Sequence, residues 1–312
     1  MKTRNFVVAF LLIAVLVFAS AVSFGDDKVS LKLNLTKGKT YLIKNSTESV
    51  IVQKDKGKEQ KRTQKIGMTL NYFVQDVDST GLYTIKITFS AAKYKMITSF
   101  GVIEYDSQDT KSPPPASALV FSAMVGQSLV IRMAPNGKVS SVQGVDAMIN
   151  KIVKTINVGK NIAPMIKQQF GEEQLKEMFE TATSVYPETP IGPGDAWPKK
   201  STVSRGYPII VESTYKFADR KDGLVTINVT GFATPNTGVP PMDLGIAKLQ
   251  YTLSGKQEGT IKVNESTGMI ASSRMLQKLS GQVESIPSKE GEQSVTAPIT
   301  ITSTITSETT EQ

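Results

Sequence analysis

The residue types best suited to ligand chemistry stand together in the segment Asp76-x-Asp78-x-Thr80-Gly81. Carboxylates and a hydroxyl at alternate positions before a glycine are typical of the first half of a calcium-binding loop. The EF-hand form of that loop also needs a bidentate Glu at its twelfth position, which here is Ile87. Asp, Thr and Gly each favour turns for local reasons, so the segment predicts a hairpin turn without a metal.

The composition excludes most catalytic chemistry, because the chain has no histidine and no cysteine. Ser-His-Asp and Cys-His mechanisms, thiolate ligands and disulfides are all ruled out. A glycosidase needs only two carboxylates, but the acidic residues fall mostly in turns, at a helix start and near the C-terminus. Trp197 is the only tryptophan, so no carboxylate pair stands among sugar-stacking aromatics. We expect no catalytic residue, no metal and no cofactor, with a histidine-free carboxylate hydrolase as the minor alternative.

The N-terminus has the pattern of an export signal. Lys2 and Arg4 precede the apolar run 6–19, which is shorter than the ~20 residues of a membrane-spanning helix. Ala19-Ser20-Ala21 offers a small-x-small cleavage site, so residues 1–21 predict a signal peptide that is removed after residue 21 or 25. We expect an exported protein, periplasmic or extracellular, with no transmembrane span after cleavage. It is not expected to be a lipoprotein, because no cysteine can carry the lipid.

Alternation of apolar and polar residues predicts β-strands over most of the remaining chain. The clearest alternating runs are 29–35, 66–74, 83–89 and the Ile/Thr-rich 299–305. The turn formers of 76–81 join two of these runs into a hairpin. A second hairpin is expected at Asn136-Gly137, where this pair predicts the positive φ angles of a type I′ turn.

Helix is expected mainly in the middle of the chain. In 145–156 the apolar residues recur at the helical period and form one stripe. Further short helices are predicted around Ile162, Met165, Ile166 and Phe170, around Leu175, Met178 and Phe179, and near 116–125.

The two halves of the chain show a similar order of motifs. The matching segments are 37–41 and 193–197, 72–87 and 215–229, and 130–139 and 260–270. We interpret this as an internal duplication, although glycine turns in unrelated antiparallel sheets would look alike. The predicted fold class is mainly β (α+β), with two similar, curved antiparallel sheets and a small helical insert. The expected boundaries are 28–140, 141–183, 184–308 and a polar tail at 309–312.

Several turns and strand starts share a pattern, in the segments Leu31-x-Leu-Asn-Leu-x-Lys-Gly38-x-x-Tyr41, Gly126-x-Ser128, Asn136-Gly137-Lys138-Val139 and Gly194-Asp195-x-Trp197. These segments resemble a bacterial family of exported or surface proteins known only as a domain of unknown function. The resemblance implies bacterial export and a β-rich fold, and it implies no activity. Many relatives look like lipoproteins, and this chain departs from them in lacking the required cysteine.

Curved sheets whose strands have one apolar face can leave an apolar cavity around a helical insert. This possibility is the basis of the leading functional hypothesis. We expect an exported, non-enzymatic envelope protein that binds a lipid or a hydrophobic segment between its β halves. The predicted lining residues are Ile66, Met68, Leu70, Tyr72, Ile85, Ile87, Tyr215, Ile227 and Tyr251. These residues equally suit a closed core, which is the ordinary use of such side chains.

The chain is basic, with 36 Lys+Arg against 28 Asp+Glu and a formal net charge of +8. Positive charge is concentrated in 53–65, which is expected to end a hairpin. Residues there that could contact an anionic surface are Lys54, Lys56, Lys58, Lys61, Arg62 and Lys65. The alternative function is a structural or adhesive envelope component that binds protein or an anionic wall polymer. A solvated loop explains the same charge, and nucleic acid is not an expected partner, because no aromatics are interleaved with the lysines.

Overall fold

The computed structural model describes residues 28–55, 57–109, 111–156, 166–167, 170–183, 185–204, 206–245, 247–289 and 291–312. The predicted signal peptide, Lys56, Ile162 and Met165 lie outside the described residues.

Strands dominate the described chain, which confirms the prediction of a mainly β fold. The first strands are β1 (Thr40–Asp55), β2 (Lys58–Val77), β3 (Tyr83–Thr98), β4 (Gly101–Asp106), β5 (Ser128–Met133) and β6 (Val139–Gln143). The later strands are β7 (Ala196–Val203), β8 (Ile209–Lys221), β9 (Leu224–Pro235), β10 (Met242–Asp243), β11 (Ala247–Asn264), β12 (Ile270–Pro287) and β13 (Val295–Glu311).

The described strands form one antiparallel 13-stranded sheet, where the sequence predicted two. Its order is β6-β5-β3-β2-β1-β13-β12-β11-β9-β8-β7, with β4 beside β3 and β10 beside β11. Strand β13 joins the halves, because it pairs with β1 from Gln53↔Ile299 to Tyr41↔Glu311. This pairing satisfies backbone groups that two separate sheets would each leave exposed at an edge. Residues 309–311, predicted to lie in a polar tail, therefore belong to β13.

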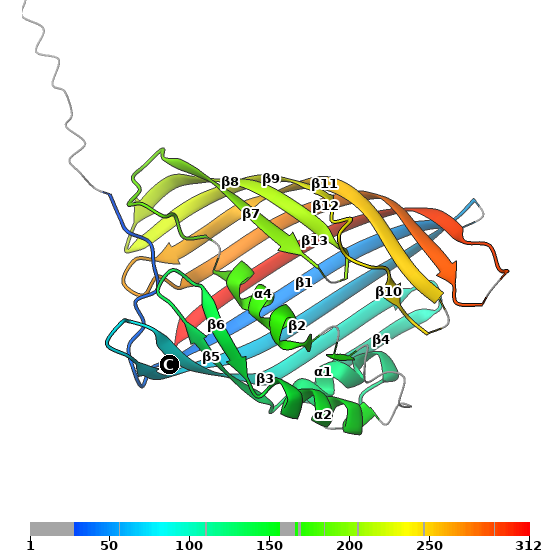
Figure 1. Ribbon diagram of the computed structural model, residues 1–312, viewed down its shortest axis with the longest axis horizontal. Helices are drawn as coiled ribbons and strands as arrows, with labels where there is room; N and C mark the ends of the chain where they lie inside the picture. Colours follow the sequence, from blue (N-terminus) through cyan, green and yellow to red (C-terminus); the bar gives the residue numbers. More distant parts are fainter. Residues whose placement is uncertain are drawn as a thin grey trace, which may run out of the picture.

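The sheet is strongly curved and open, and its end strands β6 and β7 come round toward the same side (Figure 1). Glycine occupies strand positions at which a Cβ atom would collide with the neighbouring strand. A Cβ atom at Gly255 would lie 1.9 Å from the backbone oxygen of Lys278, and one at Gly281 would lie 1.9 Å from that of Thr252. Only a residue without a Cβ atom fits at these positions. The sheet thus has a concave inner face, which holds the core.

Three helices of the described chain match helical segments predicted from the sequence. They are α1 (Leu119–Met124), which follows the 3-10 turn η1 (Ala116–Ala118), α2 (Val145–Ile156) and α4 (Glu172–Ala182). The apolar stripe of α2 contributes Val145, Met148, Ile149 and Ile152 to the core. The helices therefore cover the inner face rather than forming a separate domain.

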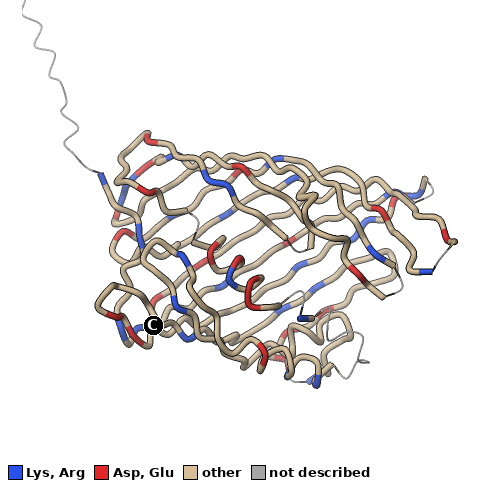
Figure 2. Tube along the Cα trace, viewed as in Figure 1, with Lys and Arg blue, Asp and Glu red and all other residues tan. Residues whose placement is uncertain are grey.

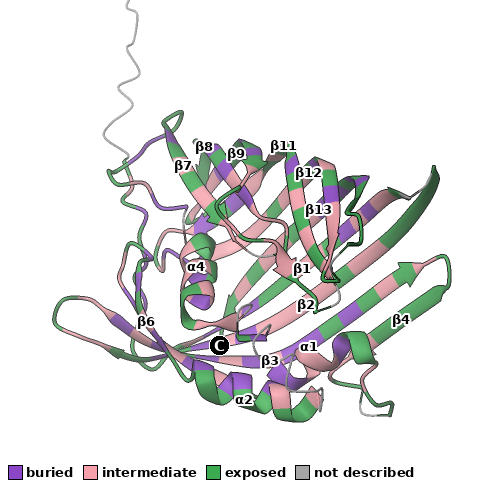
Figure 3. Ribbon diagram, turned by 45° about the vertical axis from the view of Figure 1, so that its right-hand side comes forward, coloured by how far each residue is buried: buried purple, intermediate pink, exposed green. Residues whose placement is uncertain are grey.

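Helix α4 lies between the two ends of the sheet (Figure 3). Glu180 Oε1 accepts a hydrogen bond from the backbone N–H of Val139 on end strand β6, at 2.9 Å. Glu177 Oε1 accepts one from the N–H of Ser204, just beyond end strand β7, at 3.1 Å. These carboxylates satisfy backbone donors beside the open edges of the sheet. The helix is therefore held at both ends of the sheet at once.

Residues 29–35 do not form the strand that their alternation predicted. Their leucines are buried, as expected for one apolar face, but the segment makes one isolated β-bridge and no ladder. The N–H groups of Leu33 and Asn34 donate instead to the backbone oxygens of Pro135 and Thr267. These acceptors lie in turns of different halves, so the segment crosses the end of the sheet with no strand beside it.

A two-residue type I′ turn occurs at Asp222-Gly223 and not at the predicted Asn136-Gly137. Asp222 has a φ of 53° and Gly223 a φ of 73°. In the earlier hairpin the N–H of Gly137 donates back three residues at 2.9 Å, which places Pro135 and Asn136 at the centre of the turn. Proline fixes φ near −65°, so this turn cannot have positive φ at both central residues.

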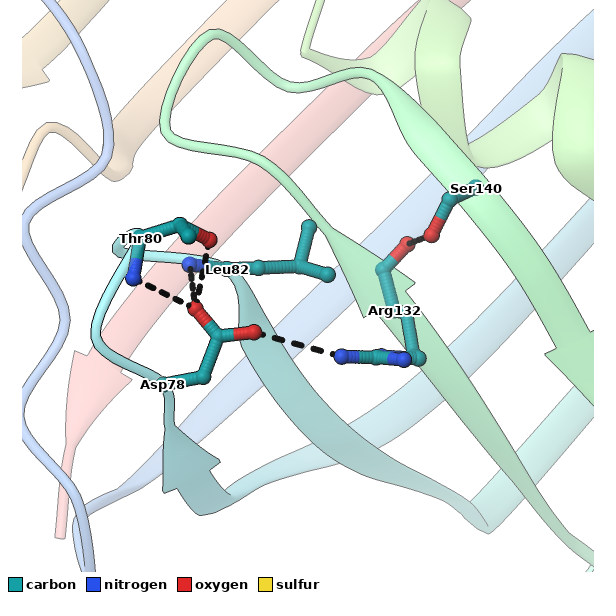
Figure 4. A network of polar contacts seen from close by, with 5 residues as sticks. All are labelled: Asp78, Thr80, Leu82, Arg132 and Ser140. Atoms are coloured by element: carbon teal, nitrogen blue, oxygen red, sulfur yellow. Dashed lines mark hydrogen bonds and ion pairs between the residues drawn. The ribbon is translucent and has the colours of Figure 1, made fainter.

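The segment 76–81 forms the hairpin turn that its sequence predicted (Figure 4). Asp78 Oδ1 accepts hydrogen bonds from the hydroxyl and the N–H of Thr80, at 2.6 and 2.9 Å, and from the N–H of Leu82, at 3.0 Å. Arg132 lies 3.2 Å from Oδ2. The Thr80 hydroxyl, followed by the backbone donors, holds the pKa of Asp78 below its ordinary value. The carboxylate is thus engaged in holding the turn.

The two halves repeat one local arrangement. The N–H of Gly38 donates to the backbone oxygen of Val74 at 2.8 Å, and the N–H of Gly194 donates to that of Phe217 at 3.0 Å. A β-bulge follows Val74 in the first half and Phe217 in the second. These positions match within the predicted repeat, and the duplication itself remains a prediction.

Candidate ligand-binding chamber

The inner face carries two apolar clusters. The larger cluster includes buried residues of α2 and α4 together with the strands they cover. The smaller cluster surrounds Ile51, Leu253 and Ile301. By register it lies further along the strands, toward the end of the sheet that contains the β1–β2 hairpin turn. The interior is therefore divided into two apolar regions.

A line of polar side chains separates the clusters, and we call it the polar rung. Its members occupy one level across the sheet and are Ser49, Ser303, Gln277, Gln257 and Ser213. The hydroxyls of Ser49 and Ser303 are 2.8 Å apart, and Gln257 Nε2 donates to Ser213 Oγ at 2.8 Å. Gly231 lies between these last two in register, and a Cβ atom there would come within 2.6 Å of Ser213 Oγ. Each member of the rung is hydrogen-bonded to another member, in one group of Ser49 with Ser303 and a second of Gln277, Gln257 and Ser213.

A cavity of about 80 Å³ lies within the larger cluster, and we call it the chamber. Its apolar lining includes Leu35, Ile43, Ile85, Met133, Phe179 and Met269. Its polar lining includes Asn45, Tyr72, Thr183, Tyr186, Ser307 and Thr309. None of the described residues that line it has a charged side chain. The chamber thus suits a neutral, mainly apolar occupant.

Tyr72 is a buried chamber residue whose hydroxyl is left without a partner. The side chain is buried, with 9% of its surface exposed. Its ring packs edge-on against Phe179 of α4, but its hydroxyl makes no hydrogen bond within the described chain. Burial raises the pKa of Tyr72 well above its ordinary value. Tyr186, also in the lining, differs in donating to the backbone oxygen of Gly268 at 2.7 Å.

Beside the chamber, the inner face remains accessible to solvent. Ile305 lies on the inner face by alternation with Ser303 and Ser307, yet 38% of its surface is exposed. It is paired with Thr47 on one side and with Met275, which is half-buried, on the other. An exposed isoleucine on the concave face marks an apolar surface that is not fully covered. This surface adjoins the chamber through Ser307, which lines it.

All nine predicted lining residues lie on the inner face. Those buried in the larger cluster are Leu70, Tyr72, Ile85, Ile87, Tyr215 and Ile227. Only Tyr72 and Ile85 of the nine line the chamber. Ile66 and Met68 are half-buried near Ile305, and Tyr251 packs edge-on against Tyr207 beside the smaller cluster. The nine share one face but do not form one site.

The sequence reasoning missed most of the chamber. Phe179, Met269, Ser307 and Thr309 come from α4, from the β11–β12 turn and from β13. Phe179 was visible as part of an apolar helical stripe, but nothing in the stripe indicated which strand it would cover. Ser307 and Thr309 alternate with outward residues of β13, and their position opposite β1 depends on the joining of the two halves.

A larger trough of about 560 Å³ lies between β1, β2, β3 and β4. Gly67, which has no side chain, is among its lining residues, and the lining also includes lysines and carboxylates of the outer face. Four of these charged side chains pair with each other: Lys93 lies 2.8 Å from Asp106, and Lys95 pairs with Glu104. The hydrogen bond from Lys93 lowers the pKa of Asp106. Because most of its charged groups are already paired, the trough is a weaker candidate than the chamber.

The predicted anionic-surface residues lie at the far end of the β1–β2 hairpin. Lys54 is near the end of β1, and Lys58, Lys61, Arg62 and Lys65 follow in β2. Lys65 lies 3.7 Å from Glu48. Lys54, Lys58, Lys61 and Arg62 are remote in register from the chamber, whose β1 members are Ile43 and Asn45, whereas Lys65 pairs with Glu48, three residues from Asn45.

Among the helices of the described ranges, none has the length and apolar character needed to cross a membrane. Charged residues are distributed over both halves of the sheet and along α4 (Figure 2).

The sequence model of a family of unknown function (DUF6263) matches residues 80–270, more than half of the chain. The chain belongs to this family, which confirms the resemblance noted from its turns. None of the curated proteins matches the chain.

Two solved structures match the chain at low similarity. A lipovitellin structure described for its lipid–protein interactions matches at 12% identity with a TM-score of 0.46, over 89% of this chain and 26% of its own. The chain therefore spans about a quarter of that protein's length. An outer membrane channel from Pseudomonas putida F1 has a TM-score of 0.19 at 8% identity, over 88% of this chain and 97% of its own. With TM-scores below 0.5, neither likeness bears on function.

Proposed function

We propose that this member of a family of unknown function is an exported, non-enzymatic envelope protein that binds an apolar or amphipathic ligand in the chamber. The observation that carries the proposal is the buried, unpartnered hydroxyl of Tyr72 in a mainly apolar, uncharged cavity. An unsatisfied buried hydroxyl costs about 1–3 kcal/mol, so a group that bonds to it is favoured. A ligand with an apolar body and one neutral hydrogen-bonding group meets both requirements.

The size of the chamber limits how such a ligand can bind. A cavity of roughly 150 Å³ holds one benzene ring, and the chamber has about 80 Å³. It therefore holds only part of a lipid, and the remainder lies along the accessible inner surface at Ile66, Met68 and Ile305. Asn45, exposed at the margin of the chamber, is placed to bond a polar group there.

The lining supports binding rather than catalysis. Its hydroxyls belong to Ser307, Thr309, Thr183, Tyr72 and Tyr186, and no carboxylate, lysine or arginine stands among the described lining residues to act as a base. Thr183 is engaged in donating to the backbone oxygen of Gly137 at 2.9 Å. The residues present hold a ligand without a route for activating a nucleophile.

The test is mass spectrometry of the protein purified from its host without detergent. One sample is kept native, a second is extracted with organic solvent to identify any bound lipid, and the intact mass gives the N-terminus. A stoichiometric amphiphile and a mass beginning after residue 21 or 25 support the proposal. Repeated absence of any bound organic species, with ordered water as the only occupant, refutes the ligand proposal. A mass that retains residues 1–21 refutes export with cleavage.

A matched pair of variants localises the ligand. Thr309 lines the chamber from β13, whereas its neighbour Thr310 is exposed on the other face of the same strand. Thr309→Leu fills part of the chamber and is expected to lower ligand occupancy, while Thr310→Leu leaves it unchanged. Equal occupancy in both variants places the ligand elsewhere.

A structural or adhesive envelope component is the second candidate. It is favoured by the tight packing of the larger cluster, in which Ile85, Ile87 and Ile227 have no exposed surface. An empty chamber in the native sample, together with retention on isolated cell wall, would establish this role instead.

A further inference from the structure

The β3–β4 hairpin ends in an apolar tip that nothing in the described chain covers. Phe100, in the turn, is fully exposed. Ile97 and Val102 are paired across the two strands and are 41% and 57% exposed. Next to the tip lies a collar of ion pairs, formed by Lys95 with Glu104 and by Lys93 with Asp106. The hairpin is therefore apolar at its end and charged behind it.

The depth of the tip matches that of an interfacial anchor. Three residue steps separate the Lys95–Glu104 pair from the Thr98–Gly101 pair beside the turn. At about 3.4 Å per step this is about 10 Å. Segments that rest in a bilayer interface bury their apolar side chains about 5–10 Å deep. The charged collar then reaches the level of the lipid headgroups.

The basic end of the β1–β2 hairpin flanks this tip. Thr63 of β2 pairs with Ile97, so Arg62 and Lys61 lie by register at the level of the β3–β4 turn. By alternation along paired strands, Lys61 and Lys54 share the outer face with Ile97. Neither lysine forms an ion pair within the described ranges, and both are exposed. Unpaired positive charge thus stands within one or two strands of an exposed aromatic ring.

We propose that these two hairpin ends form a docking edge for an anionic phospholipid bilayer. Phe100, Ile97 and Val102 enter the interface, and Lys54 and Lys61 contact lipid phosphates. Each element is weak alone, since an apolar tip of this size or a few lysines give only reversible attachment. Together they select a surface that is both apolar and anionic. A wall polymer or nucleic acid would bind the lysines but would leave the apolar tip exposed to water.

The docking edge is independent of ligand binding in the chamber. It lies at the opposite end of β1 and β2 from Tyr41 and Tyr72, so a chamber shown to be empty would leave the inference standing. Conversely, a failure of docking would leave the proposed ligand site untouched.

The test is vesicle flotation of the chain from Val22 onward. The apolar run 6–19 is omitted because it would bind vesicles by itself, and all of the described structure begins after it. Vesicles of phosphatidylcholine alone are compared with vesicles that also contain phosphatidylglycerol. We expect binding mainly to the anionic vesicles and a decrease as salt is raised.

Two variants separate the apolar from the electrostatic contribution. Phe100→Ser and the double variant Lys54→Glu with Lys61→Glu are each expected to lower binding at least about fivefold. The controls are Phe73→Ser, an exposed phenylalanine at the other end of β2, and Lys216→Glu with Lys262→Glu on exposed strand positions of the second half. Both controls are expected to bind as the parent protein does.

A spectroscopic variant reports insertion directly. In Phe100→Trp the new indole is expected to shift its emission to the blue and to be quenched by brominated lipid, while the buried Trp197 is not. An unquenched indole, or full vesicle binding by Phe100→Ser, overturns the inference. Binding that a soluble polyanion abolishes while Phe100→Ser has no effect would assign the hairpins to a polymer partner.

Discussion

The ring of Phe179 meets the ring of Tyr72 edge-on, with centroids 6.4 Å apart and planes at 78°. This contact brings helix α4 down onto the second strand of the sheet and closes one wall of the chamber. Edge-to-face pairs are favoured by the quadrupoles of the two rings and hold them in fixed orientation. The same contact helps to bury the Tyr72 hydroxyl. Among the described residues, α4 offers this hydroxyl no acceptor.

Removal of the Tyr72 hydroxyl is expected to stabilise the ligand-free protein. Tyr72→Phe abolishes the cost of burying an unpaired polar group and raises the free energy of unfolding by up to about 1–3 kcal/mol. Tyr186→Phe is the matched control, because that hydroxyl donates to Gly268 and its loss should cost about 1 kcal/mol. Urea unfolding of delipidated protein measures both. A loss of stability in Tyr72→Phe as large as that in Tyr186→Phe would mean that the Tyr72 hydroxyl has a partner.

The free energy of unfolding is expected to fall at alkaline pH because of the buried tyrosines Tyr72 and Tyr186. Burial raises the pKa of Tyr72 and of Tyr186 above the ordinary value of 10.0, so above that pH the unfolded chain loses protons that the folded chain keeps. The unfolded state then binds fewer protons, and the free energy of unfolding falls as pH rises. Each group contributes up to about 1.4 kcal/mol per pH unit.

Urea midpoints measured from about pH 9 to about pH 11 check this slope. Tyr72→Phe should show a shallower decline than the parent protein. Tyr186→Phe should likewise show a shallower decline, because burial raises the pKa of Tyr186 as well. Identical slopes for Tyr72→Phe and the parent would show that Tyr72 ionises in the folded state.

Local patterns predicted the elements better than their assembly. The α2 helix and the 76–81 turn could be predicted from the sequence, because each depends on residues within a few positions of one another. The pairing of Ile43 with Thr309 was not readable, because alternation fixes which face a residue occupies and not which strand lies beside it. Tyr72 was therefore named as a lining residue, while Phe179 and Thr309, which complete the chamber, were not.

Helix α4 is expected to control exposure of both edges of the sheet. Glu180→Ala removes the acceptor for Val139 N–H, and Glu177→Ala removes the acceptor for Ser204 N–H. Each should cost about 1 kcal/mol, because a hydrogen bond to a partly exposed carboxylate is weakened by solvent. Amide hydrogen exchange should increase at the matching edge only. Glu173→Ala, on the exposed side of α4, should leave the exchange of both amides unchanged. Faster exchange of the Val139 or Ser204 amide in Glu173→Ala would assign the effect to the stability of the helix instead.

The curvature of the sheet predicts opposite responses at two strand glycines. Gly255→Ala would place a Cβ atom 1.9 Å from the backbone oxygen of Lys278, so β11 and β12 must separate. We expect a loss of more than about 2 kcal/mol, the range typical of forced backbone displacement in a packed region. In Gly67→Ala the nearest atom is 3.5 Å away, and the change should be within about 0.5 kcal/mol or slightly stabilising. Thermal unfolding of the two variants distinguishes them. Unfolding of Gly255→Ala at the parental temperature would mean that β11 and β12 lie further apart at this position than the 1.9 Å contact requires. The concave inner face would then be shallower than the chamber requires.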